Sequence, residues 1–438
     1  MALRWLVALF VATPLVAQSS AEVNAGIQFN FASPGARSLA RGGAFIADAS
    51  DATAAYANPA GLVNLPAAEV SIELRTSEFT HTYTDRGHAF GPPSNYLDDN
   101  IDGLRSATSK SRVNNVAFAS VVVPIGRIAL AAYRHELANF AATASTQGAF
   151  YTQFDDQHPR IGRHYPAVSE IRLRIVGLGM AAGARIGSRL SLGVGVRRYD
   201  SEADSTTQRF RSQLGYGPPD YDKLDNTQTQ RGGGESFGVN AGLLLDLTRR
   251  LSIGASYRQG FAFPVRVEYI QHSDVIVSPP VGNGDKAANT RFHVPSFYGL
   301  GMSLRPTANT SIALDVNRIT YSDLARDFVL LFEEEPRYSA PDGTEIRVGA
   351  EVILTRDRVP RLPFPLALSI GGWRDPDHTI RVSDATDTQR ILFRPGSDDT
   401  HVSFGVGMLF DTRAQVHAAI DKSSRQTVFS ISMMARFR

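Results

Sequence analysis

From residue 67 to its end, the chain alternates apolar and polar side chains with a period of two. Val402, Phe404 and Val406 fall on one face of such a segment, and Ser403 and Gly405 fall on the other. This period predicts β-strands with one face in apolar and the other in polar surroundings. No segment of this part of the chain shows the period of 3.6 residues that a helix would have. We count 14 candidate strands, at residues 67–84, 111–123, 127–138, 169–186, 190–204, 234–247, 250–270, 290–305, 309–324, 343–355, 364–374, 399–411, 414–421 and 425–437.

The connections between these segments alternate in length. Tight turns are expected at residues 124–127, 187–189, 248–249, 306–308 and 412–413. Long polar loops are expected near residues 85–110, 139–168, 205–233, 271–289, 325–342 and 375–398. Short turns at one end and long loops at the other are typical of outer-membrane barrels, in which the short turns face the periplasm. Closure of the sheet also leaves no unpaired edge in lipid.

We therefore predict an all-β fold, a 14-stranded antiparallel transmembrane β-barrel over residues 67–438. The even strand number places both ends of the barrel on the periplasmic side. A secreted soluble β-protein is the alternative, because alternation alone does not identify lipid.

The N-terminus has the form of an export signal. Basic Arg4 precedes an apolar run at residues 5–17, which is too short for a membrane-spanning helix of ~20 residues. We expect a signal peptide at residues 1–21, with cleavage between residues 17 and 25. Together with the barrel pattern, it predicts a multi-pass protein in the outer membrane of a Gram-negative-type bacterium.

Composition excludes several classes of function. The chain has 0 cysteines, which excludes disulfides and thiolate-based zinc or redox sites. Its formal net charge of +2 argues against electrostatic capture of nucleic acid. Nothing in the sequence requires a cofactor.

A glycine- and alanine-rich stretch at residues 35–61 lies between the signal and the first strand. It has too few long apolar side chains to build a core of its own, but it can fill a confined space inside a barrel. We predict an N-terminal hatch, or plug, in the lumen at residues 22–66. Tight backbone and a turn make the following residues the expected hatch or gating positions: Gly42, Gly43, Asn58, Pro59, Ala60 and Gly61.

At this point the chain resembles the FadL-type family of outer-membrane transporters for long-chain fatty acids and aromatic hydrocarbons. The resemblance covers nearly all of the mature chain. It is carried by residues 25–29 (AGIQF), 37–44 (RSLARGGA), 58–61 (NPAG) and 237–243 (FGVNAGL), together with Asp48 and Asp51.

The resemblance implies a 14-stranded barrel with an N-terminal hatch and a gap in the wall beside a bent third strand. By this resemblance we place ligand contacts at Ile27, Phe29, Phe31 and Phe45. The region that matches the bent strand is Tyr133, Arg134 and His135.

The function that follows is passive uptake of hydrophobic small molecules, by binding in the barrel, hatch movement and lateral release into the membrane. We expect a monomer that contacts outer-membrane lipid and lipopolysaccharide and is inserted by the barrel-assembly machinery. A FadL-like partner of a secretion system and a water-filled porin for polar solutes are the alternatives.

Two short motifs suggest other chemistry. Residues 234–238 (GESFG) match a nucleophile elbow, but a glycine-rich loop precedes them and a strand follows, so we do not expect an enzyme. Asp98, Asn100 and Asp102 match the first half of a calcium loop, but Ser109 stands where the bidentate Glu is needed. They are a weak candidate for a metal site.

Overall fold

The computed structural model describes residues 27, 29, 31–154, 159–164, 166–212, 219–272, 285–327, 337–383, 391, 396–410 and 413–437. The expected signal peptide lies outside these residues. Among them, no helix is both long and apolar enough to cross a membrane.

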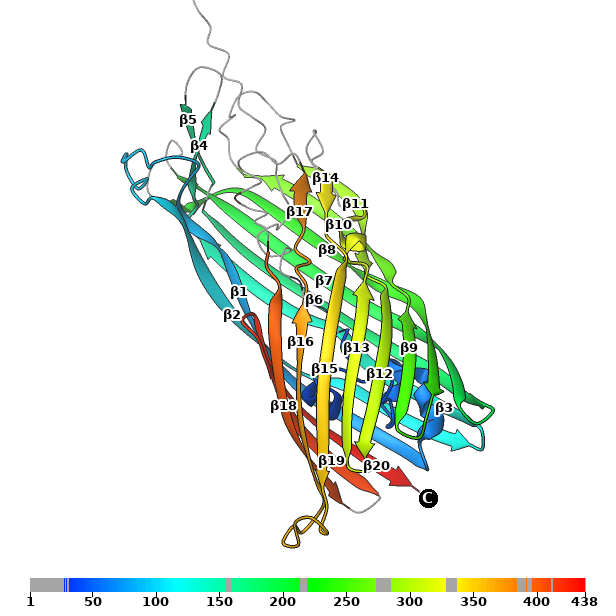
Figure 1. The fold of residues 1–438 in the computed structure, drawn as a ribbon. Coiled ribbons are helices and arrows are strands. Elements are labelled where there is room, and N and C mark those ends of the chain that lie inside the picture. Colours follow the sequence, from blue (N-terminus) through cyan, green and yellow to red (C-terminus); the bar gives the residue numbers. More distant parts are fainter. Residues whose placement is uncertain are drawn as a thin grey trace, which may run out of the picture.

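The strands form one closed antiparallel barrel (Figure 1). The last strand pairs with the first, from Ala68 opposite Phe437 to Phe79 opposite Gln426, which closes the wall. β9 with β10, and β11 with β12, each make one strand of the wall, so that fourteen strands close the barrel. The segments of the wall are β1 (Ala68–Ala89), β2 (Gly103–Ile125), β3 (Ile128–Thr146), β6 (Ala167–Ile186), β7 (Leu190–Ser212), β8 (Pro219–Asp246), β9 (Leu251–Arg258), β10 (Phe261–Gln271), β11 (Lys286–Val294), β12 (Phe297–Thr307), β13 (Thr310–Ile319), β15 (Gly343–Leu354), β16 (Leu366–Asp375), β18 (Asp399–Phe410), β19 (Ala414–Lys422) and β20 (Gln426–Phe437).

The predicted strand number is confirmed, and so are the tight turns, except that Thr412 of the turn expected at 412–413 lies outside the described residues. The long-loop ends differ from the prediction. Several strands extend further outward than expected, and β8 is the longest because its polar first half still pairs with β7. Two small antiparallel pairs lie in the loops: the hairpin of β4 (Phe150–Phe154) with β5 (Pro159–Arg163), and β14 (Arg337–Ser339) with β17 (Arg381–Ser383), which come from different loops. The strand expected at 309–324 stops at Ile319, and η3 (Tyr321–Ala325) follows.

The described part of the N-terminal segment, residues 31–66, lies against the inner face of the wall near the short-turn end (Figure 1). It forms α2 (Ala36–Ala40), α3 (Ala54–Ala57) and η1 (Pro59–Asn64). Asn58 ends α3 and begins η1, where its side-chain oxygen accepts a hydrogen bond from the Ala60 amide at 3.2 Å. Its amide nitrogen donates to the backbone carbonyls of Ile46 and Leu243, at 2.9 and 3.0 Å, and so joins the segment to the wall.

Glycines on the inner face make room for this backbone. A Cβ on Gly371 would lie 2.2 Å from the Arg41 carbonyl carbon, and a Cβ on Gly193 would lie 2.3 Å from the Ala60 nitrogen. Real Cβ atoms do not approach other atoms this closely, so only glycine fits at these wall positions. Glycines at these wall positions therefore leave the space that the backbone of the N-terminal segment occupies.

The polarity of both wall faces reverses along the longer strands. On β6, Leu178 and Met180 point outward near the short-turn end and are 53% and 69% exposed. Further along, the outward positions are Arg172 and Arg174, while the inward Leu173 is buried and apolar. An apolar outer face is what lipid requires, so the reversal marks where the strand leaves the membrane. Beyond that level, the wall encloses an apolar interior.

Candidate functional site

The apolar interior above the N-terminal segment is the candidate binding site. Its wall residues come from β1, β3, β6, β7, β10, β11, β12 and β13, and most are aromatic or branched. Phe263 and Phe292 lie with ring centroids 5.2 Å apart, and Phe292 is 6.4 Å from Phe29 of the N-terminal part. The main wall members of this cluster, which we call the lumen cluster, are Phe79, Leu137, Phe140, Ile171, Leu173, Ile175, Tyr199, Phe263, Val265, Val267 and Phe297.

The four predicted ligand residues separate into two places. Ile27, Phe29 and Phe31 join the lumen cluster, with Phe31 6.4 Å from the ring of Phe297. Phe45 instead packs with the alanines of the N-terminal segment in a second cluster, below the first. Its backbone amide donates to Asp315 at 2.7 Å, so this residue fixes the segment to the wall and does not line the apolar interior.

Two buried arginines border the lumen cluster. The Arg258 guanidinium lies 3.5 Å from the ring centroid of Phe297, and that of Arg197 lies 5.2 Å from the ring of Tyr199. Both side chains also lie over Tyr56, at 4.6 and 5.7 Å. Each keeps buried N–H groups without a hydrogen-bond partner. Unpaired buried donors are costly, so this is a place where an acceptor would be stabilised.

The wall is incomplete between β2 and β3. Their ladder runs from Ile125 opposite Ile128 to Phe118 opposite His135 and then stops. Each strand stays paired with its other neighbour, β2 with β1 as far as Leu104 and β3 with β6 as far as Thr146. We call the unpaired edges, residues 104–117 and 136–146, the β2–β3 seam.

Bulges and polar side chains account for the seam. The register shifts at Glu73/Leu74 against β2 and at Glu136/Ala138 against β6, close to the level where the ladder stops. Bulges bend strands and end pairing, so the two edges diverge. Side chains bridge the gap: Ser109 donates to the Thr143 carbonyl, Ser111 to the Ala141 carbonyl, and Arg134 to the Val116 carbonyl.

The predicted gate residues lie at the lower end of this seam. His135 is the last residue of β3 in the ladder, and its ring stacks on Tyr56 of α3 with centroids 3.8 Å apart. Tyr133 meets Tyr56 edge-on at 6.3 Å. The N-terminal segment therefore contacts the wall at the height where the seam begins. Arg134 faces outward and pairs with Glu136 at 3.3 Å.

A small cavity of about 70 Å³ lies between the lumen cluster and the seam. Phe29, Phe31 and Phe79 line it on the cluster side, and Asn115 and Asn139 line it on the seam side. Charged residues, among them Arg75, Glu345 and Arg347, also line this cavity, which lies between the lumen cluster and the seam.

Charged residues hold the N-terminal segment in place. The Arg41 Nη1 atom lies 2.6 Å from Asp48, and Arg305 of the wall lies 2.6 Å from the other oxygen of the same carboxylate. Arg37 bridges to Glu351 of β15 at 2.7 Å. Gly42 and Gly43 have φ of 64° and 77°, and the Gly42 carbonyl accepts from Arg347 at 3.0 Å. Gly61 has no positive φ, but a Cβ there would lie 2.2 Å from the Ala49 carbonyl.

This network makes retention of the segment dependent on pH. Burial opposes ionisation of Asp48, but Arg41, Arg37 and Arg305 outweigh it and lower its pKa from 3.8 to about 2. A lowered pKa stabilises the folded segment above pH ~4 and is lost as the pH falls towards 2, with a contribution of roughly 2 kcal/mol. We expect ion leak through the barrel, measured in planar bilayers, to stay constant from pH 8 to 5 and to rise below about pH 4.

The variant Asp48→Asn isolates this contribution. It removes the titrating group, so the leak should be raised at neutral pH and should change less on acidification than in the unaltered protein. Equal acid-induced increases in both proteins would assign the effect to other carboxylates.

The weak metal candidate has other partners in the structure. Asp98 forms an ion pair with Arg163 at 2.8 Å, and the neighbouring Asp99 bonds to His88 at 2.7 Å. Within the described residues, no group of three or more His, Cys, Asp or Glu side chains is placed to hold a metal ion.

Comparison with known proteins agrees with this architecture. The model of the family described as outer membrane protein transport protein (OMPP1/FadL/TodX) matches residues 15–335. The chain belongs to this family. This FadL/TodX-family protein is therefore a multi-pass β-barrel of the outer membrane. The proteins of the family transport hydrophobic compounds across that membrane. A search of curated proteins gave no match.

Solved structures show the same fold. A Pseudomonas aeruginosa FadL homologue is 14% identical with a TM-score of 0.64, covering 94% of this chain and 99% of its own. The Ralstonia pickettii toluene transporter TbuX is 15% identical with a TM-score of 0.56, covering 93% and 100%. The Pseudomonas putida toluene transporter TodX is 15% identical with a TM-score of 0.54, with the same coverage. At these identities the likeness concerns the fold.

The residues of the site that sequence reasoning missed are the inward aromatics of the long strands, such as Phe263 and Phe297. The sequence does contain a signal for them. In these parts of the strands, the residues that alternate with the apolar ones are Arg or Glu, whereas elsewhere they are Gly or Ser. Residues 171–175 already show it in the sequence.

Proposed function

We propose that this protein takes up long-chain fatty acids or hydrocarbons passively, by binding them in the lumen cluster and releasing them sideways through the β2–β3 seam. The observation that carries the proposal is the stop of the ladder at Phe118 and His135, beside a cavity that residues of the cluster and of the seam both line. Transport of toluene by TodX and TbuX, as their names state, supports hydrocarbons as one ligand class.

Binding would be driven by burial of the apolar ligand. The lumen cluster offers aromatic rings on several strands, and transfer of apolar surface from water to such a site contributes about 25 cal/mol per Å². A ligand with an acidic head has a further partner, because Arg197 and Arg258 keep unpaired N–H groups at the border of the cluster. Arginine and carboxylate match in geometry and charge. A hydrocarbon would use the cluster alone.

We further propose that the N-terminal segment acts as the hatch. Tyr56 covers both arginines and stacks on His135, so a displacement of α3 would free the arginines and remove the support of the seam at once. Asn58 and Pro59 at the end of α3 are the natural pivot, since Asn58 joins the segment to Leu243 of the wall.

Release at the lower end of the seam would keep an apolar ligand out of water. The bridges across the seam come from side chains, including one from Asn115 to Glu136, and a passing ligand can separate them without breaking a backbone ladder. Only the lower end of the seam, at Phe118 and His135, lies at the level where the outer face of the wall becomes apolar. An apolar ligand that leaves there enters the acyl chains of the membrane. Neither a porin for polar solutes nor a secretion partner needs a strand pair that stops short in this way.

Retention of ligand by the purified protein tests the proposal. We expect mass spectrometry to find a fatty acid or hydrocarbon bound to the detergent-extracted protein after incubation with both. Phe263→Ser, a polar change in a fully buried ring of the lumen cluster, should reduce retention about tenfold or more, because a buried Phe contributes ~1.5–3 kcal/mol.

The matched control is Phe404→Ser, the same change on a lipid-facing ring that is 51% exposed. It should leave retention unchanged. Equal losses in both variants, or no ligand bound to the unaltered protein with either compound present, would contradict binding in the lumen cluster.

A further inference from the structure

Two buried arginines of the inner wall, which we call the arginine pair, lack a balancing negative charge. Arg197 of β7 is 2% exposed, and Arg258, the last residue of β9, is 3% exposed. Neither forms an ion pair with a carboxylate among the described residues, and both keep buried N–H groups without a hydrogen-bond partner. A guanidinium group stays protonated in proteins, so burial cannot remove its charge. A buried charge without a counter-charge is strongly destabilising.

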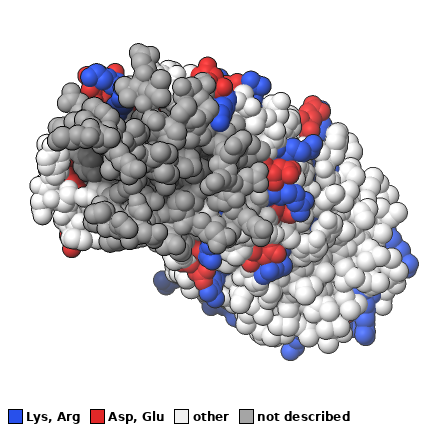
Figure 2. Space-filling model, turned by 90° about the horizontal axis from the view of Figure 1, so that it is seen from above, with Lys and Arg blue, Asp and Glu red and all other residues white. Residues whose placement is uncertain are grey.

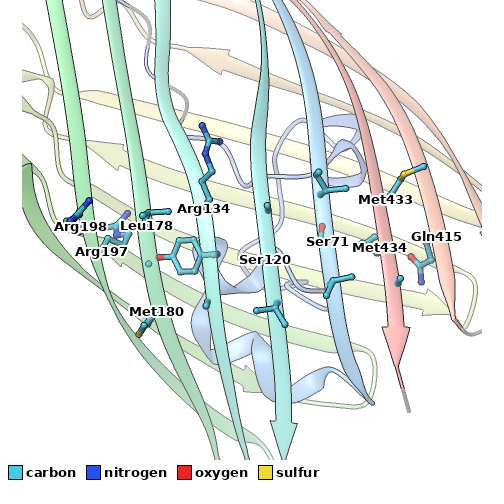
Figure 3. A pocket seen from close by; sticks show the side chains of 18 of the residues that line it. Ser71, Ser120, Arg134, Leu178, Met180, Arg197, Arg198, Gln415, Met433 and Met434 are labelled. Atoms are coloured by element: carbon cyan, nitrogen blue, oxygen red, sulfur yellow. The ribbon is translucent and has the colours of Figure 1, made fainter.

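Other arginines of the barrel do lie beside a carboxylate. In the lumen, Arg347 is 2.9 Å from Glu345. On the outer face, Arg198 is 3.2 Å from Glu235, although it directly follows Arg197 on β7 (Figure 3). Figure 2 shows Lys or Arg side chains next to Asp or Glu side chains at several places along the wall. The arginine pair departs from this pattern.

The strand register brings the arginine pair together across β8. Arg197 lies opposite Gly238, and Arg258 lies opposite Asn240, two residues further along the same strand. Gly238 has no side chain to fill the space beside Arg197, and a Cβ there would lie 4.0 Å from the Arg197 Nη2 atom. Both guanidinium groups lie over the ring of Tyr56, and their charges repel each other. One small region of the lumen therefore holds two positive charges.

Unpaired neutral groups surround the same region. Tyr133 lies opposite Gly179, which lies opposite Arg197 on its other side. The Tyr133 hydroxyl is buried without a hydrogen-bond partner, and so are both ring nitrogens of His135, which stacks on Tyr56. The groups that interact most strongly with the arginine pair are tyrosines, and no carboxylate is among them. Converging donors and positive charge without an acceptor favour a bound anion.

We propose that the arginine pair binds a small inorganic anion, chloride, when the barrel holds no ligand. The anion accepts hydrogen bonds from the free N–H groups of the pair and from the Tyr133 hydroxyl. The enclosure favours a monatomic ion, because the Arg258 guanidinium lies only 4.6 Å from the ring of Tyr56 and 3.5 Å from that of Phe297. A larger anion would have to displace a ring. The inference goes beyond the proposed function and does not rest on it, since the two charges need an anion whether the transported ligand is an acid or a hydrocarbon.

Binding of chloride to the full chain in a non-ionic detergent, without added ligand, tests the site. The NMR line of chloride broadens when the ion exchanges with a protein site, and we expect the unaltered protein to broaden it. Arg197→Gln with Arg258→Gln should reduce the line width to that of detergent alone.

The unfolding temperature gives a second readout. A ligand that binds only the folded state stabilises it, so chloride should raise the unfolding temperature above that in gluconate at the same ionic strength. Gluconate is too large for the enclosed site. The double variant should lose this difference between the two salts.

Arg198→Gln with Arg266→Gln is the matched control. It removes the same two charges from the outer face of the wall, where each arginine has a carboxylate beside it. Chloride binding should be unchanged. Tyr56→Phe keeps the ring over the arginine pair and should also retain chloride binding. Folding of each variant is checked by its heat-modifiable migration in electrophoresis.

Four results would overturn the proposal. The first is equal loss of line broadening in the two double variants, and the second is equal stabilisation by chloride and gluconate. The third is chloride binding that appears only in Tyr56→Phe, which would assign the counter-charge to an ionised Tyr56. The fourth is a fatty acid that co-purifies in equimolar amount while chloride has no effect, which would make the carboxylate of a transported ligand the resident anion.

Discussion

Deletion of residues 26–62 is expected to convert a closed barrel into an open, ion-conducting pore. A barrel of fourteen strands is wider than one that its own side chains fill, since eight strands already reach that limit. In the structure, the space near the short-turn end is taken by the N-terminal segment, in which Phe45, Tyr56 and Leu62 are at most 1% exposed. Single-channel recording should show steady conductance in the deletion variant and none in the full chain.

A smaller change in the N-terminal segment should raise the ion conductance less than its deletion does. Asn58→Ala with Pro59→Ala removes the bonds from Asn58 to Ile46 and Leu243 but leaves the segment in the chain. We expect brief openings on a closed baseline, with an unchanged barrel by heat-modifiable migration. A deletion variant that stays closed would show that wall residues alone block the lumen, and would contradict a hatch.

The strands were predictable because a barrel wall between two different surroundings imposes a period of two on every segment. The tight turns were predictable for a similar reason, since they interrupt that period over two to four residues. β7 (Leu190–Ser212) begins where the sequence predicts it, but its far end was placed too early. There the outward face turns polar in solvent, so polarity no longer distinguishes strand from loop.

The candidate site was only partly predictable. Ile27, Phe29 and Phe31 do join the apolar interior, but Phe45 does not, because its neighbours in the segment place it below the lumen cluster. The seam was hidden for another reason. An unpaired strand edge leaves no mark on side-chain periodicity, and only the polar residues that bridge the edges, such as Ser109 and Ser111, record it in the sequence.

The small-residue stretch at 35–61 predicted a segment that packs in a confined space, and this is how it lies in the structure. Its charged contacts could not be predicted, because the partners of Arg37 and Asp48 are Glu351 and Arg305, hundreds of residues away. Only the closed barrel brings these positions together.

Closing the seam is expected to stop uptake. Ser111 reaches the backbone of β3 beside Ala142, so cysteines at these two positions stand on opposite edges of the seam. The chain has 0 native cysteines, and a short reducible thiol cross-linker can therefore join only this pair. A covalent bridge prevents the edges from separating. Ala142 belongs to the same buried cluster, but the aromatic side chains of the lumen cluster and the N-terminal segment are unaltered.

Ser169→Cys with Thr207→Cys is the matched control. These residues face each other across the continuous ladder of β6 and β7, with their hydroxyl oxygens 2.9 Å apart. Cross-linking there joins strands that are already paired, so it should not affect transport.

The most direct measurement is uptake of a labelled fatty acid and a labelled hydrocarbon by cells that rely on this barrel, before and after cross-linking of positions 111 and 142. Lateral release requires that uptake fall to background when the seam is bridged, return when the cross-linker is reduced, and stay unchanged in the control pair. Undiminished uptake through a fully bridged seam would contradict lateral release and direct the ligand through the lumen.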